Sequence, residues 1–172
     1  MSTGTAGTAA MRSQTLDTPD GPFTIVESAD GDVMASGWSA DIRAVSARAG
    51  IPPESVIAGE SHSAPAVRSF YEGDASGIAA VSVRSKGTDF QEKVWEYLRS
   101  IPAGEVRTYS EVAAALGRPR AFRAVAQACG RNPAGLFVPC HRVVAADDAL
   151  AGFAWGINVK KKLLAREAAL IR

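Results

Sequence analysis

The feature that most constrains the fold is a pair of short helices predicted in the run TYSEVAAALGRPRAFRAVAQACGR, residues 108–131. Thr108 and Glu111 have the spacing of a capping box, and Gly117 is typical of a helix end. Pro119 suits the first position of a second helix. Two short helices joined by a turn that contains glycine predict a helix-turn-helix.

The second of these helices has two different faces. At about 100° per residue, the apolar side chains share one face: Phe122, Val125, Ala126 and Cys129. The opposite face carries arginines and small residues: Arg120, Arg123, Ala124, Gln127, Ala128 and Arg131. Arginines can neutralise phosphates, and alanines let a helix lie close to a nucleic-acid groove. This face predicts DNA contact, and a merely solvated face is the alternative.

Charge is unevenly distributed along the 172 residues, although the net charge is only +1. Residues 1–80 carry 4 Lys or Arg and 10 Asp or Glu, a balance of −6. Residues 81–172 carry 15 Lys or Arg and 8 Asp or Glu, a balance of +7. A basic half that contains a helix-turn-helix indicates contact with a polyanion. Charge also drifts along chains without a functional reason, so this asymmetry alone does not decide the question.

The acidic half is predicted to form a small α+β unit. FTIVES and DVMASGWS predict two strands joined by a turn at residues 29–31, and IAAVSVRS predicts another strand. Short helices are predicted in ADIRAVSARAG and SAPAVRSFYEG. We expect a structural role for this half, because it contains no cluster of residues that suggests chemistry.

Several classes of protein are not expected. Residues 1–13 lack the basic start and apolar stretch of a signal peptide, and we expect them to form a disordered tail. No run approaches the roughly 18 consecutive apolar residues of a membrane helix, so we expect a cytoplasmic protein with no membrane partner. Two cysteines and two histidines are too few and too poorly spaced for structural zinc, and neither a metal nor a cofactor is expected.

The basic half begins with GTDFQEKVWEYLRSIP, which predicts an amphipathic helix that faces the core and is capped by Thr88 or Asp89. Its chemistry is expected further on, in GLFVPCHRVV. A cysteine must form a thiolate to act as a nucleophile, and His141 and Arg142 supply a base and a positive field for Cys140. The apolar residues before the cysteine predict a buried strand. Because neighbours on an extended chain point to opposite faces, contact between the cysteine and the histidine would need a turn or a bridging water.

The motif Pro139-Cys140-His141-Arg142-Val143 matches the active site of the O6-alkylguanine-DNA alkyltransferases, and the chain resembles this family, especially its bacterial Ada-type branch. The likeness covers about residues 86–170, in order and spacing: GTDFQEKVW, RTYSEVAAALGRP, RAVAQAC, VPCHRVV, GFAWG and LLAREA. It is loose over residues 15–85. The resemblance implies a small mixed α/β, ribonuclease H-like domain at 14–84. A mainly helical domain with the helix-turn-helix would follow at 85–172.

The resemblance also implies an activity: DNA repair by direct reversal of damage, by a monomer that acts once. Cys140 would accept the alkyl group, chiefly methyl, of O6-alkylguanine after the base is flipped out of double-stranded DNA. Its proton would pass through a water to His141, which Glu167 orients. Asn132 matches a structural asparagine, and Tyr109 matches the residue that protonates the leaving guanine. Activity on O4-alkylthymine is left open.

DNA recognition follows from the same resemblance. The second helix of the helix-turn-helix would enter the minor groove, and Arg123 would fill the space left by the flipped base. The other expected DNA contacts are Thr108, Arg120, Ala124, Gln127 and Arg131. The expected pocket residues are Tyr109, Val143, Phe153, Ala154 and Trp155. Many relatives have tyrosine and glycine in place of Phe153 and Trp155, so we expect a narrow pocket that favours methyl over benzyl adducts.

Two other classes share parts of this pattern. A cysteine hydrolase could use Cys140 and His141, but such enzymes usually place nucleophile and base far apart in sequence. A DNA-binding module could recognise alkylated bases without chemistry. Relatives of that kind replace the acceptor cysteine, which is present here. Cys129, on the apolar helix face, is expected to be a buried structural residue.

Overall fold

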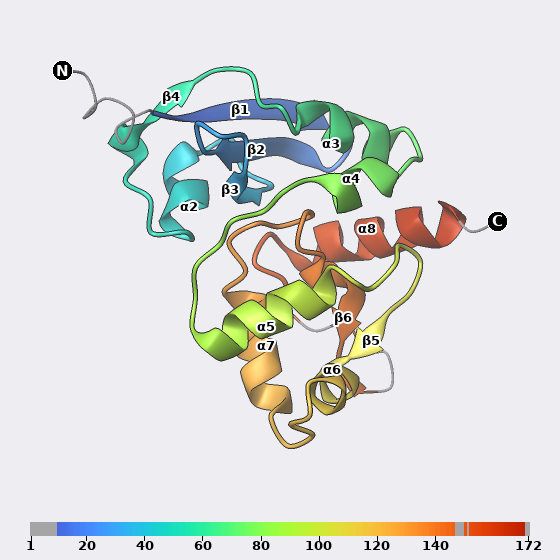
Figure 1. The fold of residues 1–172 in the computed structure, drawn as a ribbon. Coiled ribbons are helices and arrows are strands. Elements are labelled where there is room, and N and C mark those ends of the chain that lie inside the picture. The colour runs from blue at the N-terminus through green and yellow to red at the C-terminus, as the bar shows by residue number, and fades with distance from the viewer. Residues whose placement is uncertain (1–9, 147–149, 151, 171–172) are drawn as a thin grey trace.

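A four-stranded sheet and three short helices form the N-terminal half of the computed structural model (Figure 1), which describes residues 10–146, 150 and 152–170. The strands are β1 (Met11–Thr18), β2 (Gly21–Glu27), β3 (Val33–Gly37) and β4 (Val56–Ala58), in the order β3-β2-β1-β4. The first three are antiparallel, and β4 pairs parallel to β1. The helices are α2 (Ile42–Ala47), α3 (Ala64–Tyr71) and α4 (Ser76–Ala80).

The sheet confirms one hairpin and corrects two predictions. The β2–β3 hairpin is confirmed, with its turn at residues 28–32. The predicted tail extends too far, because Met11, Arg12 and Ser13 pair with β4 at the start of β1. The predicted strand IAAVSVRS is wrong: its first residues form α4, and Val83 makes only an isolated bridge to Val33. Neither error was visible locally, because pairing with a distant strand decides both.

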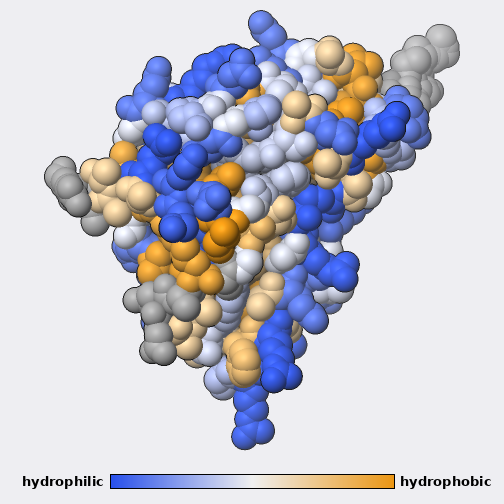
Figure 2. All heavy atoms as spheres, turned by 180° about the vertical axis from the view of Figure 1, so that it is seen from behind, coloured by the Kyte–Doolittle hydropathy of each residue, from blue (hydrophilic) through white to orange (hydrophobic). Residues whose placement is uncertain are grey.

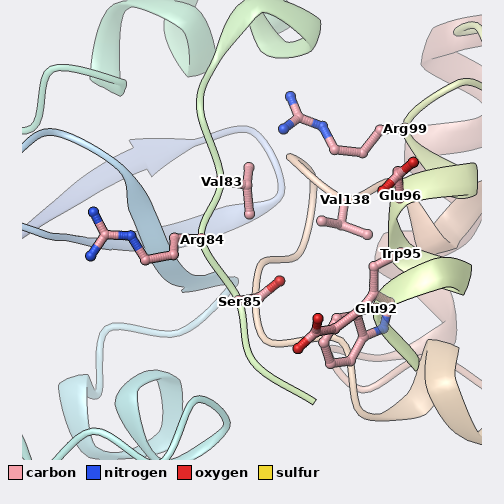
Figure 3. A pocket seen from close by; sticks show the side chains of 8 residues that line it. All are labelled: Val83, Arg84, Ser85, Glu92, Trp95, Glu96, Arg99 and Val138. Carbon is pink, nitrogen blue, oxygen red and sulfur yellow. The ribbon is translucent and has the colours of Figure 1, made fainter. Parts of the chain in front are cut away.

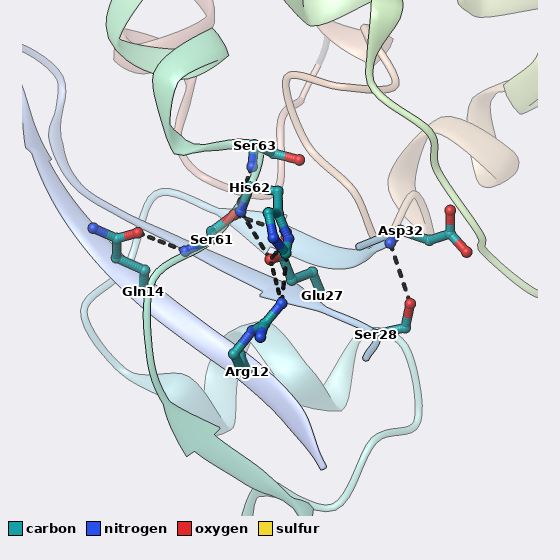
Figure 4. A network of polar contacts seen from close by, with 8 residues as sticks. All are labelled: Arg12, Gln14, Glu27, Ser28, Asp32, Ser61, His62 and Ser63. Carbon is teal, nitrogen blue, oxygen red and sulfur yellow. Dashed lines mark hydrogen bonds and ion pairs between the residues drawn. The ribbon is translucent and has the colours of Figure 1, made fainter. Parts of the chain in front are cut away.

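Glu27, at the end of β2, anchors the segment that leads into α3 (Figure 4). Its carboxylate is fully buried and accepts hydrogen bonds from Ser61 Oγ at 2.9 Å and from the His62 backbone nitrogen at 2.8 Å. Arg12 approaches the same carboxylate at 3.4 Å. A buried carboxylate is tolerated only with such partners, so this network fixes the path of the chain between β4 and α3.

In the described part of the C-terminal half, the structure has four helices and a two-stranded ladder: α5 (Asp89–Leu98), β5 (Arg107–Thr108), α6 (Tyr109–Ala115), α7 (Phe122–Gly130), β6 (Val143–Val144) and α8 (Ile157–Leu170). Thr88 caps α5 through a capping box with Gln91. The predicted capping box of Thr108 and Glu111 is confirmed at the start of α6, with bonds of 3.0 and 2.8 Å. Helices α6 and α7 form the predicted helix-turn-helix, and Gly117, with φ of +77°, ends the first of them.

Helix α7 differs from the prediction in its start and in its faces. Pro119 and Arg120 lie in the turn before the helix, which begins at Phe122. Phe122 is 43% exposed, whereas Ala128 is fully buried. Tertiary packing decides which face is buried. Helix α5 packs against the Ala128 side of α7, and Trp95 Nε1 donates a 2.8 Å hydrogen bond to the Ala128 carbonyl.

The two halves share one core and are joined by hydrogen bonds at the edge of the sheet. A single apolar cluster includes Phe23 and Phe70 from the first half and Leu98 and Leu163 from the second. At the edge strand β3, the Ser36 nitrogen donates to the Pro133 carbonyl at 2.9 Å, and the Ser36 carbonyl accepts from Gly135 at 3.0 Å. The sheet therefore supports the loop that precedes Cys140.

The surface carries mixed polarity. Hydrophilic residues predominate on the face in Figure 2, and hydrophobic residues form small areas between them. Within residues 10–146, 150 and 152–170, no helix is long and apolar enough to span a membrane.

Candidate active site

Cys140 begins a single 3₁₀ turn, Cys140–Arg142, at the end of a buried loop. The predicted strand before it is wrong: Gly135–Val138 is buried but closes on itself through a bridge between its two ends, and Leu136 has φ of +77°. A leucine in the left-handed region is uncommon and is held here by tertiary packing. The turn resolves the problem of alternating side chains, because Cys140 and His141 no longer lie on an extended chain.

Asn132 ties this loop together. Its Nδ2 donates to the Val138 carbonyl at 2.8 Å and to Cys140 Sγ at 3.2 Å. Its Oδ1 accepts from the Ala134 backbone nitrogen at 2.9 Å. One buried amide thus fixes the loop and donates directly to the sulfur, where a thiolate would gain most from it.

The thiol of Cys140 is buried, with 8% of the residue exposed, and burial raises its pKa. The hydrogen bond from Asn132 and the positive charges of Lys160 and Arg48 act in the opposite direction. The net result is a thiol that stays protonated at rest. It therefore needs a base when it reacts.

His141, Arg142 and Glu167 form a buried cluster behind the cysteine. His141 Nε2 lies 2.8 Å from Glu167 Oε2. Arg142 grips the same carboxylate through two bonds of 2.9 and 2.7 Å and also donates to the Ile101 carbonyl. Burial alone would raise the pKa of Glu167, but electrostatic interaction with His141 and Arg142 and the hydrogen bonds from these residues lower it to about 2. Glu167 is therefore ionised and accepts a hydrogen bond from the protonated Nε2 of His141.

The other ring nitrogen of His141 is free to act as a base. Because Nε2–H donates to Glu167, Nδ1 of the neutral imidazole carries a lone pair. Nδ1 is buried and has no hydrogen-bond partner among the described protein atoms. A buried polar atom of this kind suits a bridging water. Arg142, by contrast, faces Glu167 and does not supply the positive field that its place beside Cys140 suggested.

A cavity of about 390 Å³ opens beside Cys140. Its described lining is Tyr109, Ala126, Cys129, Gly130, Cys140, Gly152, Phe153 and Ala154. Tyr109 reaches it because β5, which immediately precedes this residue, pairs with β6, which follows the active-site turn. Burial, with smaller contributions from the two cysteines, raises the pKa of Tyr109 to about 12, so its hydroxyl remains a proton donor.

Comparison with known proteins shows the family of this chain. The family model "6-O-methylguanine DNA methyltransferase, DNA binding domain" matches residues 89–169. A methylated-DNA–protein-cysteine methyltransferase of Methanosarcina acetivorans is 36% identical over 152 residues, 84% of this chain and 97% of that protein. This chain belongs to the methylated-DNA–protein-cysteine methyltransferase family.

Other members of the family match in different proportions. The solved structure of Mycobacterium tuberculosis OGT in complex with DNA has a TM-score of 0.77 and 32% identity, and the match covers 92% of this chain and 94% of that one. The bifunctional transcriptional activator/DNA repair enzyme Ada of Escherichia coli is 51% identical over 83 residues, 48% of this chain. The match covers 23% of Ada and 52% of a Methanosarcina barkeri relative, so this chain spans about half or less of the length of these curated relatives.

Two residues that the family resemblance placed in the pocket lie elsewhere. Val143 is fully buried, and its carbonyl accepts a 2.8 Å bond from Lys160 Nζ. Trp155 packs on the sheet half, where a Cβ at Gly37 would come within 2.0 Å of its ring. Neither is part of the cavity lining that the structure describes. Contrary to expectation, Trp155 therefore does not narrow the active-site pocket directly. Any preference for methyl adducts depends on Phe153 and the loop around it.

The residues of the expected DNA face lie on or beside the helix-turn-helix. Arg123 and Gln127 are exposed on α7, Arg131 is exposed directly after it, and Ala124 is half-buried among them. Arg120 is exposed in the turn before the helix, and half-buried Thr108 caps α6. The predicted face stays exposed only in part, because Arg120 lies before α7, Arg131 lies directly after it and Ala128 is buried.

Sequence reasoning missed two cations near the nucleophile. Lys160 is 1% exposed, and helical spacing from Leu163 and Glu167 could have placed it on the buried face of α8. Arg48 follows α2 in the sheet half, donates to the Asn132 carbonyl at 3.3 Å, and lies 5.5 Å from the centre of the Trp155 ring. No local signal marks Arg48, because its partners are more than 80 residues away.

Proposed function

We propose that this chain repairs O6-alkylguanine in double-stranded DNA by transferring the alkyl group to Cys140. The observation that carries the proposal is the buried thiol at the mouth of a cavity that α7 helps to line, with the His141–Glu167 pair behind it. The nucleophile thus lies beside the helix with the predicted DNA face. A cysteine hydrolase would not need its nucleophile beside a DNA-binding helix.

The transfer is an in-line displacement. Cys140 Sγ forms a bond to the alkyl carbon as the bond from that carbon to guanine O6 breaks. The thiol proton passes through a water to His141 Nδ1, and Glu167 stabilises the imidazolium. Asn132 donates to the sulfur throughout, so the developing thiolate is stabilised where it forms.

Tyr109 is proposed to donate its phenolic proton to the guanine as it leaves. The pKa of about 12 keeps this proton in place until the purine becomes basic. We predict that Tyr109→Phe lowers the rate of methyl transfer about 100-fold, the scale of one general acid. Tyr97→Phe on α5 is the matched control, and single-turnover kinetics with methylated DNA is the measurement. Equal rates for the two variants would contradict the role of Tyr109.

DNA is proposed to lie along α7, with the helix in the minor groove and Arg123 in the space vacated by the flipped base. Support comes from exposed Arg123 on α7, from exposed Arg131 directly after it, and from the DNA complex of the Mycobacterium tuberculosis relative. The nucleophile, base and cavity all come from one chain, so we propose that a monomer is the working unit.

The reaction is proposed to stop after one event. Alkyl transfer leaves a thioether, which has no carbonyl for water to attack. We predict that labelled methyl on excess methylated DNA moves to the protein until one methyl per chain is bound. Scintillation counting of the precipitated protein measures the plateau. Protein-bound label that keeps rising beyond one methyl per chain, or release of free label, would refute the proposal.

A further inference from the structure

A second cavity, of about 310 Å³, lies next to the first between the two halves of the molecule. Its lining is Ala47, Arg48, Lys86, Gln91, Trp95, Gly130 and Arg131. Gly130 lines both cavities, so the second one begins where the active-site cavity ends. Three cations from different segments face this space: one follows α2, one precedes α5 and one follows α7.

The charge in this cavity is of one sign. Its lining contains no Asp or Glu, and Arg48, Lys86 and Arg131 form no ion pair with a described residue. The cavity on the other side of Trp95 differs (Figure 3). Its lining holds Glu92 and Glu96 as well as two arginines, and both arginines have other partners: Arg84 pairs with Asp32, and Arg99 donates to backbone carbonyls. Of these two cavities, only the one lined by Arg48, Lys86 and Arg131 attracts an anion.

Part of this site is already held in position. Arg48 is fixed by its hydrogen bonds to the Gly130 and Asn132 carbonyls and by its place over Trp155. Gln91 uses Oε1 to cap α5, which leaves its amide NH₂ as a donor. Fixed donors bind phosphate at a lower entropic cost than mobile ones, and arginine suits the geometry of phosphate oxygens.

The site also continues the predicted DNA face. Arg131 lies eight residues beyond Arg123, about 12 Å along the helix axis at 1.5 Å per residue. The two exposed arginines therefore mark the two ends of α7, with Arg131 at the cavity, where the exposed side chain of Lys86 also lies.

We propose that Arg48, Lys86 and Arg131 form a subsite for a phosphodiester of the bound DNA strand, so that the sheet half takes part in DNA binding. This inference rests on the proposed function, since the ligand is the same DNA. It assigns a contact to the acidic half, for which the sequence suggested only a structural role. Through Arg48 and its bond to Asn132, the phosphate contact is also joined to the loop that holds the nucleophile.

The test is the salt dependence of binding to a DNA duplex, measured by fluorescence anisotropy. Each phosphate contact contributes about −0.9 to the slope of log K against log [salt]. We expect Lys86→Ala and Arg131→Ala each to make the slope shallower by about 0.9, and the double variant by about twice that. Both side chains are exposed, so neither change threatens folding.

The control is Arg68→Ala, which removes one exposed cation from α3 and should leave the slope as in the parent chain. If Lys86→Ala behaves like this control while Arg131→Ala makes the slope shallower, the subsite is refuted and Arg131 acts only through the helix face. Binding slopes do not depend on methyl transfer. A chain that binds with the expected slopes but never transfers methyl would therefore refute the proposed function and leave the subsite standing.

Discussion

Cys140→Ala is expected to abolish methyl transfer and to leave binding to methylated DNA intact. The only step that the change removes is formation of the sulfur–carbon bond, because the DNA face on α7 lies outside the active-site turn. The loss should be complete, since an alanine methyl cannot act as a nucleophile. Label transfer from methylated DNA and anisotropy binding measure the two properties separately.

Cys129 provides a demanding control. It is also buried, and it lines the same cavity, so position alone does not exclude it as the acceptor. Burial, followed by the nearby Cys140, raises its pKa well above the ordinary range, and no described side chain donates to its sulfur. Cys129→Ala should therefore still accept one methyl per chain. Transfer that survives in Cys140→Ala but disappears in Cys129→Ala would reverse the assignment of the nucleophile.

Removing the carboxylate of Glu167 is expected to cost both stability and rate. Glu167→Ala leaves Arg142 and His141 buried without their partner, and breaking a buried ion pair in this way costs about 3–5 kcal/mol. Glu167→Gln keeps the volume, but its amide can present a donor to Nε2 and favour the wrong tautomer of His141. We expect this variant to fold and to transfer methyl about 100-fold more slowly or worse. Urea unfolding and single-turnover kinetics measure the two effects.

The pH dependence of stability gives a second measurement on Glu167. A free glutamate has a pKa of about 4.3, and in the folded chain the pKa is about 2. A lowered pKa stabilises the fold above about 4.3, and this contribution is lost as the pH falls from about 4.3 towards 2. The parent chain should thus lose more unfolding free energy over this window than Glu167→Gln.

A matched control is Glu96→Gln, which removes an exposed carboxylate from α5. It should unfold like the parent chain and keep its pH dependence. If Glu167→Gln and Glu96→Gln transferred methyl at the same rate, the orienting role of Glu167 would be wrong, even if Glu167→Ala were unstable.

The features that rest on local chemistry could be predicted from the amino-acid sequence. Capping boxes and the glycine at the end of α6 predicted the helix-turn-helix, because these signals lie within a few residues of one another. The residues around Cys140 predicted a nucleophile and its base for the same reason. The family resemblance added Asn132, Tyr109 and Glu167 as partners, and the structure brings all of them to the cavity or to the cluster behind it.

The features that depend on distant partners could not be predicted, because they follow from tertiary packing. Packing of α5 against α7 buried Ala128 and left Phe122 exposed, which helical spacing alone predicted the other way round. Close packing against Gly37 drew Trp155 onto the sheet half. Hydrogen bonds across more than 80 residues brought Arg48 to the Asn132 loop. The charge count suggested that the acidic half has no part in the site. Residues interact when they are close in space, however, even if they are far apart in the sequence. Folding therefore placed one cation from that half beside the nucleophile.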